Sequence, residues 1–288
     1  MTNETLESIV VPGTIAGFPA LRTRGRRGDR PTLLFLHGAF NTHEPFAPWV
    51  ERLGAAGWDA VAASRRGRLG VGPARAKGLG IADYVDDTLR VIEALGEAPI
   101  VIGHSVGGLI AQKVAEAGAC RGAVLLAPAP PAMLTAQAVA LPAYLAMMPK
   151  ILAGAPVLPA CSACERIALN RVPEAERKGI HESLVHESGK VYREMIFGTI
   201  KVDAAKVRVP MLVVAGAADR IVSLALCRAT AARYGAELKT YDDHAHWLVG
   251  EPGWTAIADD VAAWLGRSFA ISGSGDRGSQ RDKTARAG

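Results

Sequence analysis

The chain has 288 residues, of which 49% are hydrophobic and 21% are charged. This balance excludes an intrinsically disordered protein and allows one large domain or two ordinary ones with a sizeable buried core. The formal net charge is +5, but the basic residues gather in short loop-like clusters, such as residues 22–30 and 65–77, without interleaved aromatic residues. We therefore interpret these clusters as solvated loops and expect no nucleic-acid partner.

The first twenty residues carry Glu4 and Glu7, no lysine or arginine, and no long apolar run. They do not resemble a secretory signal. Four cysteines are too few for a disulfide scaffold in a chain of this length. These features predict a cytoplasmic protein with reduced cysteines.

Strand-like and helix-like segments alternate along most of the chain. The predicted strands are residues 32–36, 59–63, 99–103, 122–127, 209–215 and 237–241. The predicted helices are residues 45–56, 81–95, 107–117, 223–234 and 253–266. This alternation predicts an α/β fold whose mostly parallel, doubly wound sheet is covered by helices on both faces. The active site of such a sheet lies at the carboxyl ends of its strands.

The region between the two halves of this pattern is unusually apolar. From residue 122 to residue 164 only Lys150 is charged, yet seven prolines interrupt the region too often for a membrane span of about 20 residues. We interpret residues 131–203 as a helical lid or cap, inserted into a core formed by residues 1–130 and 204–270. The tail, residues 271–288, has no large apolar side chain from Ser272 onward and is predicted to be disordered.

A candidate nucleophile lies between a predicted strand and a predicted helix, in Gly103-His104-Ser105-Val106-Gly107. This context makes the Gly-x-Ser-x-Gly pattern specific. A strand that runs directly into a helix forces the central residue into strained backbone angles, and glycines two residues to either side leave room for it. The serine hydroxyl then stands above the sheet edge, near the positive end of the helix. Ser105 is therefore the predicted nucleophile.

Together with His37-Gly38 after the first predicted strand, this motif resembles the α/β-hydrolase superfamily. The resemblance covers roughly residues 10–268 and is weakest in the insertion, where such proteins carry variable lids. It implies a triad in the chain order serine, acid, histidine. The implied acid is Asp219, a few residues beyond the strand at 209–215. Some relatives place the acid after the strand that here ends near Ala127, but no carboxylate follows that strand before Glu165.

Two histidines compete for the role of general base, His244 and His246. Family members commonly show a Gly-His pair followed five residues later by a glutamate, and counting back from Glu251 leads to His246. Ala245 stands where glycine is usual, which leaves His244 as an alternative. His104, next to the nucleophile, is expected to pack beneath the elbow, because neighbours on a strand point to opposite faces.

The oxyanion hole of such an enzyme needs two amide donors. One is expected to be the backbone N–H of Val106, directly after the nucleophile. By resemblance to the loop that follows His-Gly, the other is expected to be Ala39, with its neighbour Phe40 as the alternative.

The leading functional hypothesis is a carboxylic ester hydrolase that acts through an acyl-enzyme and needs no metal or organic cofactor. The apolar insertion favours a small-molecule ester with an apolar acyl or alcohol group. The same triad serves lactonases, thioesterases, C–C hydrolases and perhydrolases, and some non-catalytic ligand-binding proteins reuse the fold. Epoxide hydrolases and haloalkane dehalogenases are disfavoured, because they use a carboxylate where this chain has Ser105. A lid that faces lipid is a less favoured alternative, and the insertion is also a candidate homodimer face.

Overall fold

The computed structural model describes residues 10–24, 30–68, 72–135 and 137–270. Its strands are β1 (Val10–Ile15), β2 (Phe18–Thr23), β3 (Leu33–Leu36), β4 (Ala60–Ala63), β5 (Ile100–His104), β6 (Gly122–Leu126), β7 (Met211–Gly216) and β8 (Glu237–Tyr241). Within the described residues they form one eight-stranded sheet in the order β1-β2-β4-β3-β5-β6-β7-β8. Strands β3 to β8 are parallel, whereas β2 is antiparallel to both β1 and β4. The predicted mostly parallel α/β sheet is confirmed.

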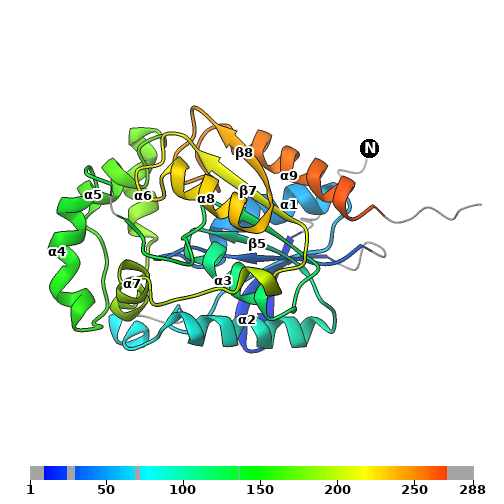
Figure 1. Ribbon diagram of the computed structural model, residues 1–288, viewed down its shortest axis with the longest axis horizontal. Coiled ribbons are helices and arrows are strands. Elements are labelled where there is room, and N and C mark those ends of the chain that lie inside the picture. The colour runs from blue at the N-terminus through cyan, green and yellow to red at the C-terminus, as the bar shows by residue number, and fades with distance from the viewer. Residues whose placement is uncertain (1–9, 25–29, 69–71, 136, 271–288) are drawn as a thin grey trace, which may run out of the picture.

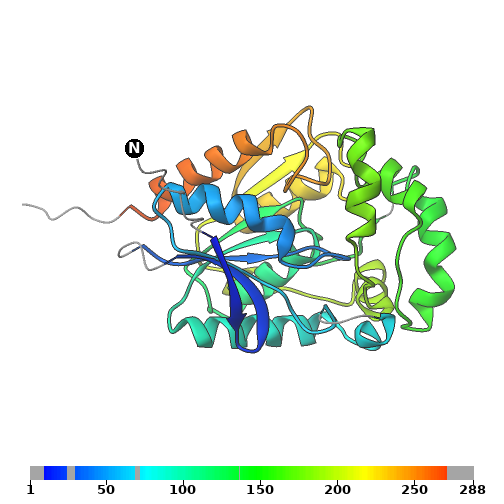
Figure 2. The same cartoon turned by 180° about the vertical axis from the view of Figure 1, so that it is seen from behind.

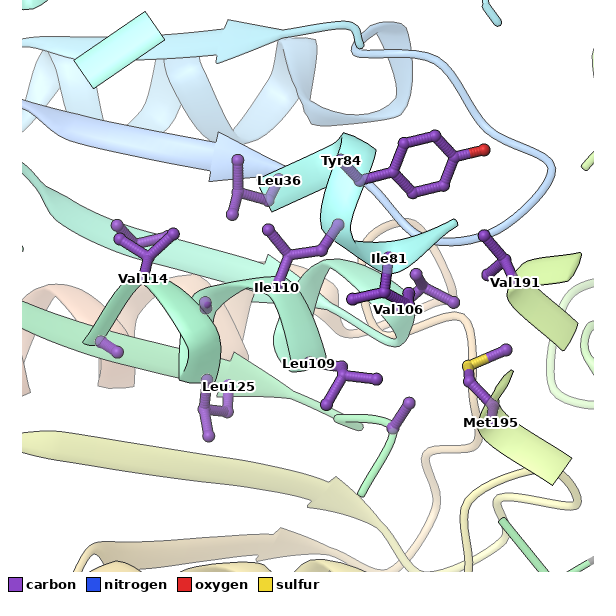
Figure 3. Close-up of a cluster of buried hydrophobic side chains, with 14 of the residues drawn as sticks. Leu36, Ile81, Tyr84, Val106, Leu109, Ile110, Val114, Leu125, Val191 and Met195 are labelled. Atoms are coloured by element: carbon purple, nitrogen blue, oxygen red, sulfur yellow. The ribbon is translucent and has the colours of Figure 1, made fainter. Parts of the chain in front are cut away.

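Helices cover both faces of this sheet (Figure 1). One face carries α1 (Ala47–Ala55) and α9 (Trp254–Ser268), and the other carries α2 (Ile81–Leu95), α3 (Val106–Glu116) and α8 (Leu224–Tyr234). Strands β3 to β7 are buried at every residue, because helices exclude water from both of their faces. Figure 3 shows part of the core between α2, α3 and the sheet, including Leu109 and Ile110 of α3.

The β1–β2 hairpin is a feature that the sequence pattern did not predict. Its two turn residues, Ala16 and Gly17, have φ angles of 51° and 83°. Positive angles at both positions belong to the tight turn that joins two adjacent antiparallel strands. Such turns usually begin with asparagine, aspartate or glycine. Because alanine stands at the first position here, the sequence carries no clear signal for the hairpin.

Between β6 and β7 the chain leaves the sheet and forms the β6–β7 segment, residues 131–203. It contains the helices α4 (Leu141–Leu152), α5 (Cys161–Ile167), α6 (Glu174–Glu182) and α7 (Gly189–Ile196). They lie together at one end of the sheet (Figure 2). Val191 and Met195 of α7 join the same buried cluster as α3 (Figure 3). That the segment acts as a separate lid stays a prediction, and the predicted disordered tail at 271–288 lies outside the described residues.

Short 3₁₀ turns complete the described elements, at Glu44–Phe46, Pro73–Ala76 and Ala204–Lys206. Helix α2 begins after Gly80, whose N–H donates to the carboxylate of Asp83 (2.8 Å), and it ends at Gly96 in the left-handed conformation. The bounds of α2 and β8 match the predicted ranges, and the other predicted elements differ from the observed ones by a few residues at their ends.

One sequence interpretation is wrong for two arginines. Arg65 and Arg68 belong to a cluster predicted to be a solvated loop, but they are only 4% and 5% exposed. Both guanidinium groups lie over the ring of Tyr84, at 4.5 and 5.7 Å from its centroid. Both also form ion pairs with Glu187 of the β6–β7 segment. The buried partner of these arginines lies about 120 residues away along the chain, so no local pattern could reveal it.

Candidate active site

Ser105 lies between β5 and α3 with backbone angles of φ 53° and ψ −116°. A non-glycine residue with these angles is strained, and such strain is characteristic of functional sites. The two flanking glycines make the sharp turn feasible. A Cβ atom at Gly103 would lie 2.3 Å from the carbonyl oxygen of Gly107, and one at Gly107 would lie 2.1 Å from that of Leu36. Glycine at both positions therefore allows α3 to begin directly against the sheet.

Three side chains that follow parallel strands meet at the carboxyl edge of the sheet. His246 Nε2 lies 3.1 Å from Ser105 Oγ, and His246 Nδ1 lies 2.8 Å from Asp219 Oδ2. A carboxylate can only accept, so Nδ1 carries the proton and Nε2 is left to accept from the serine hydroxyl. The structure thus brings together Ser105, Asp219 and His246, the three residues predicted for the triad.

Backbone amides fix the orientation of Asp219. Its Oδ1 accepts from the N–H groups of Ile221 (2.7 Å) and Val222 (3.0 Å), which leaves Oδ2 for His246. The carboxylate is thus held by one oxygen and orients the histidine with the other. This division of roles is the arrangement that a triad acid requires.

His244, the alternative base, points elsewhere. Its ring lies against Tyr241, with 5.4 Å between the centroids, and its Nδ1 is 3.7 Å from Glu251 Oε1. Its carbonyl oxygen accepts from the N–H of Ala218 (2.9 Å). His244 therefore packs within the loop that carries His246, and it has no contact with Ser105 among the described interactions.

His104 contacts the same loop. Its Nε2 donates to the carbonyl oxygen of His246 (2.8 Å), and the two rings are 5.0 Å apart. Burial, together with the nearby His246, lowers the pKa of His104 to about 3. The side chain is therefore neutral at physiological pH and bonds the backbone of His246. It also lines the cavity that contains Ser105, so its packing beneath the elbow stays a prediction.

The two predicted oxyanion donors lie beside the nucleophile. Val106 is the first residue of α3, and a Cβ atom at Gly38 would lie 3.3 Å from that of Ser105, so the loop before Ala39 touches the elbow. Among the described hydrogen bonds, neither the Val106 nor the Ala39 amide donates to a protein acceptor. Ala39 and Phe40 both line the cavity that contains Ser105. These positions suit an oxyanion hole, whose donor roles stay predictions.

A largely apolar cavity opens onto Ser105 and His246. Its wall comes mainly from the β6–β7 segment, with α4, α5, α6 and α7 all contributing side chains, among them Tyr144, Met147, Ile167, Ile180 and Tyr192. Such a cavity binds apolar groups, with a few polar atoms to orient them.

Glu251 explains the five-residue spacing that pointed to His246. This carboxyl group is fully buried, and its Oε1 accepts from the N–H of Ala245 (2.8 Å). The bond closes the loop that presents His246. Burial outweighs this hydrogen bond and raises the pKa of Glu251 to about 7.

The raised pKa predicts a stability that depends on pH. Folded Glu251 keeps its proton up to a pH of about 7, whereas the unfolded chain loses it near the ordinary value of 4.5. The protonated Glu251 side chain therefore contributes fully to the free energy of unfolding below pH 4.5. This contribution decreases as the pH rises above 4.5 and is lost as the pH passes through 7. At 1.36 kcal/mol for each pKa unit, the difference between 7 and 4.5 amounts to about 3 kcal/mol.

Urea unfolding at acidic and mildly alkaline pH tests this for the wild type and Glu251→Gln, which keeps an acceptor for the Ala245 N–H. We expect the variant to gain stability relative to the wild type as the pH rises. The same pH dependence in both proteins would contradict the role of Glu251.

Comparison with known proteins shows the family to which the chain belongs. Residues 28–253 match the family described as serine aminopeptidase, S33. The chain belongs to this family. The α/β-hydrolase resemblance inferred from the elbow motif is thereby confirmed, and the protein is a hydrolase by family. A monoacylglycerol lipase from Mycolicibacterium smegmatis is 28% identical over 252 residues, which cover 82% of this chain and 88% of that protein.

Solved structures share the fold of this α/β-hydrolase at lower identity. The monoacylglycerol lipase of Paleococcus ferrophilus aligns with a TM-score of 0.66 and 21% identity, over 86% of this chain and 98% of its own. A soluble variant of the monoglyceride lipase from Saccharomyces cerevisiae aligns with a TM-score of 0.72 and 13% identity, over 93% and 99% of the two chains. Across the described parts of this hydrolase, no helix is both long and apolar enough to span a bilayer.

Proposed function

We propose that this hydrolase cleaves carboxylic esters with an apolar acyl or alcohol group, through an acyl-enzyme formed on Ser105. One observation carries the proposal: the continuous path from Asp219 Oδ2 through the His246 ring to Ser105 Oγ. A serine hydroxyl needs such an oriented base to act as a nucleophile near neutral pH.

The geometry supports a two-step mechanism. Ser105 Oγ attacks the ester carbonyl while His246 Nε2 takes its proton, and the N–H groups of Val106 and Ala39 hold the oxyanion. His246 then gives the proton to the leaving alcohol. In the second step His246 activates a water molecule, which attacks the acyl group and frees the serine.

The apolar cavity supports the proposed substrate class. It ends at Ser105 and is walled by the β6–β7 segment, which acts as the lid over the bound ester. The relative named as a monoacylglycerol lipase favours an ester whose acyl chain occupies this cavity. A cytoplasmic location remains the expectation from the cysteine content.

The family description raises a second candidate, an aminopeptidase. Such an enzyme must bind the α-ammonium group of a peptide, which calls for a carboxylate near the nucleophile. Among the described residues that line the cavity there is no aspartate or glutamate. The lining therefore favours an uncharged ester over a peptide with a free amino terminus.

A labelling experiment combined with a substrate series tests the proposal. A fluorophosphonate probe is expected to label the wild type at Ser105 and to leave Ser105→Ala unlabelled. p-Nitrophenyl butyrate, octanoate and laurate should be hydrolysed, with kcat/KM rising from the shortest chain until the cavity is filled. A wild type that is neither labelled nor active on any of these esters contradicts an ester hydrolase, and hydrolysis of aminoacyl anilides instead would favour the aminopeptidase.

A further inference from the structure

A buried arginine holds residues 37–40, called the oxyanion loop below. Arg65 Nη1 donates to the carbonyl oxygen of His37 (2.8 Å), and its Nη2 donates to that of Gly38 (3.0 Å). Burial and the nearby Arg68 lower the pKa of Arg65 to about 10, so its guanidinium is still charged at neutral pH.

The second of these bonds acts on a candidate oxyanion donor. The carbonyl of Gly38 and the N–H of Ala39 belong to one planar trans peptide, in which they point in opposite directions. A charged donor on the carbonyl therefore fixes the direction of the N–H and polarises it, which strengthens it as a donor. Arg65 bonds the carbonyl side of this peptide and is not among the described residues that line the cavity with Ser105.

Glu187 connects this arginine to the β6–β7 segment. Its Oε2 forms an ion pair with Arg68 and lies 4.0 Å from Arg65 Nη2, and its Oε1 accepts from the hydroxyl of Tyr84 (2.6 Å). Burial raises the pKa of Glu187, but Arg68 and Arg65 lower it further than burial raises it, so the carboxylate stays charged. Tyr84 extends from α2 toward the end of the sheet where α7 lies (Figure 3).

Two more contacts join the same part of the segment to the oxyanion loop. The N–H of Val185 donates to the carbonyl oxygen of Phe40 (2.8 Å). The ring of Phe40 lies 5.5 Å from that of Tyr192, which also lines the cavity. Arg65 thus bonds two carbonyl oxygens of the oxyanion loop, and residues 185–192 contact the same loop at Phe40.

We propose that Arg65 is a positioning residue for oxyanion stabilisation and that Glu187 ties it to the β6–β7 segment. The inference rests on the proposed function. Arg65 does not touch the substrate: it orients and polarises the peptide whose N–H does. Its effect falls on the transition state, where the negative charge develops, and not on the binding of the neutral ester.

Three variants separate this role from simple structural support. Arg65→Met removes the charge and both hydrogen bonds, whereas Arg65→Lys keeps the charge but lacks the planar fork that reaches two carbonyls. Arg66→Met is the matched control, because Arg66 is the next residue and pairs with Asp87 on α2, and no described interaction joins its side chain to the oxyanion loop.

The measurements are kcat and KM for a p-nitrophenyl ester, together with two inhibition constants. A trifluoromethyl ketone forms a tetrahedral oxyanion adduct with Ser105, whereas the matching alcohol occupies the cavity without one. Removal of an oxyanion donor costs on the order of 100- to 1000-fold in rate, and here the donor is misplaced but not removed. We therefore expect kcat to fall about 100-fold in Arg65→Met and about 10-fold in Arg65→Lys, with KM unchanged. The ketone should weaken by similar factors, and the alcohol should not.

Thermal unfolding shows whether each variant is folded, and Arg65→Lys decides the test if Arg65→Met does not fold. A folded Arg65→Lys with wild-type kcat and wild-type affinity for the ketone overturns the inference. An equal loss of ketone and alcohol binding also overturns it, because that result indicates a general disturbance of the cavity. A wild type that does not turn over esters overturns the proposed function instead.

Discussion

Replacing His246 with alanine should lower kcat for ester hydrolysis by about 10⁶-fold, whereas the same change at His244 should leave kcat within a few fold of the wild type. The physical reason is position. His246 Nε2 lies 3.1 Å from Ser105 Oγ and is the base that can take its proton. The His244 ring packs against Tyr241, on another side of the same loop.

Steady-state kinetics on p-nitrophenyl octanoate checks both variants, with thermal unfolding as a measure of folding. The pair is matched, because the two histidines are separated by one residue and both are buried. The main-chain bond from His104 to residue 246 can form in either variant, since it uses a carbonyl oxygen. A comparable loss in both variants, or an active His246→Ala, would argue against this assignment of the base.

The sequence could predict the parts of the site that are encoded locally. The elbow is such a part: Gly103 and Gly107 are needed for a turn that involves only the strand, Ser105 and the first turn of the helix. The preference for His246 depended on its separation of five residues from Glu251 along the sequence. The structure supplies the cause, because Glu251 accepts from the N–H of Ala245 and thereby closes the loop around the histidine.

The parts that escaped prediction depend on contacts between distant residues. Arg65 and Arg68 look like solvated loop residues until the chain places Glu187 beside them. Charge and spacing along the sequence do not indicate that these arginines form ion pairs with Glu187. The cavity wall was foreseen only as an apolar insertion, because which of its side chains face Ser105 depends on how α4 to α7 pack over the sheet.

Asp219→Asn should lower kcat by about 10⁴-fold while leaving the fold intact, as the equivalent change does in other serine triads. Asp219 Oδ1 accepts from two backbone N–H groups, of Ile221 and Val222. The asparagine must keep its carbonyl oxygen on those donors, so its NH₂ group faces His246 Nδ1. His246 Nδ1 must then accept a hydrogen bond from this NH₂ group, so the proton of the imidazole ring moves to Nε2. A protonated Nε2 cannot take the proton of Ser105, so the nucleophile loses its base.

Asp203→Asn is the matched control for this change. Asp203 caps its own short turn through a similar bond, from the N–H of Ala205 to Oδ1 (3.0 Å), but it has no part in the triad. Asparagine caps such turns about as well as aspartate, so both variants should unfold near the wild-type temperature. A large fall in kcat for Asp219→Asn alone, with KM and the unfolding temperature retained, would place the effect on the tautomer of His246. If Asp219→Asn kept more than about a tenth of wild-type kcat, the ring proton would not depend on Asp219, and another group would have to orient the base.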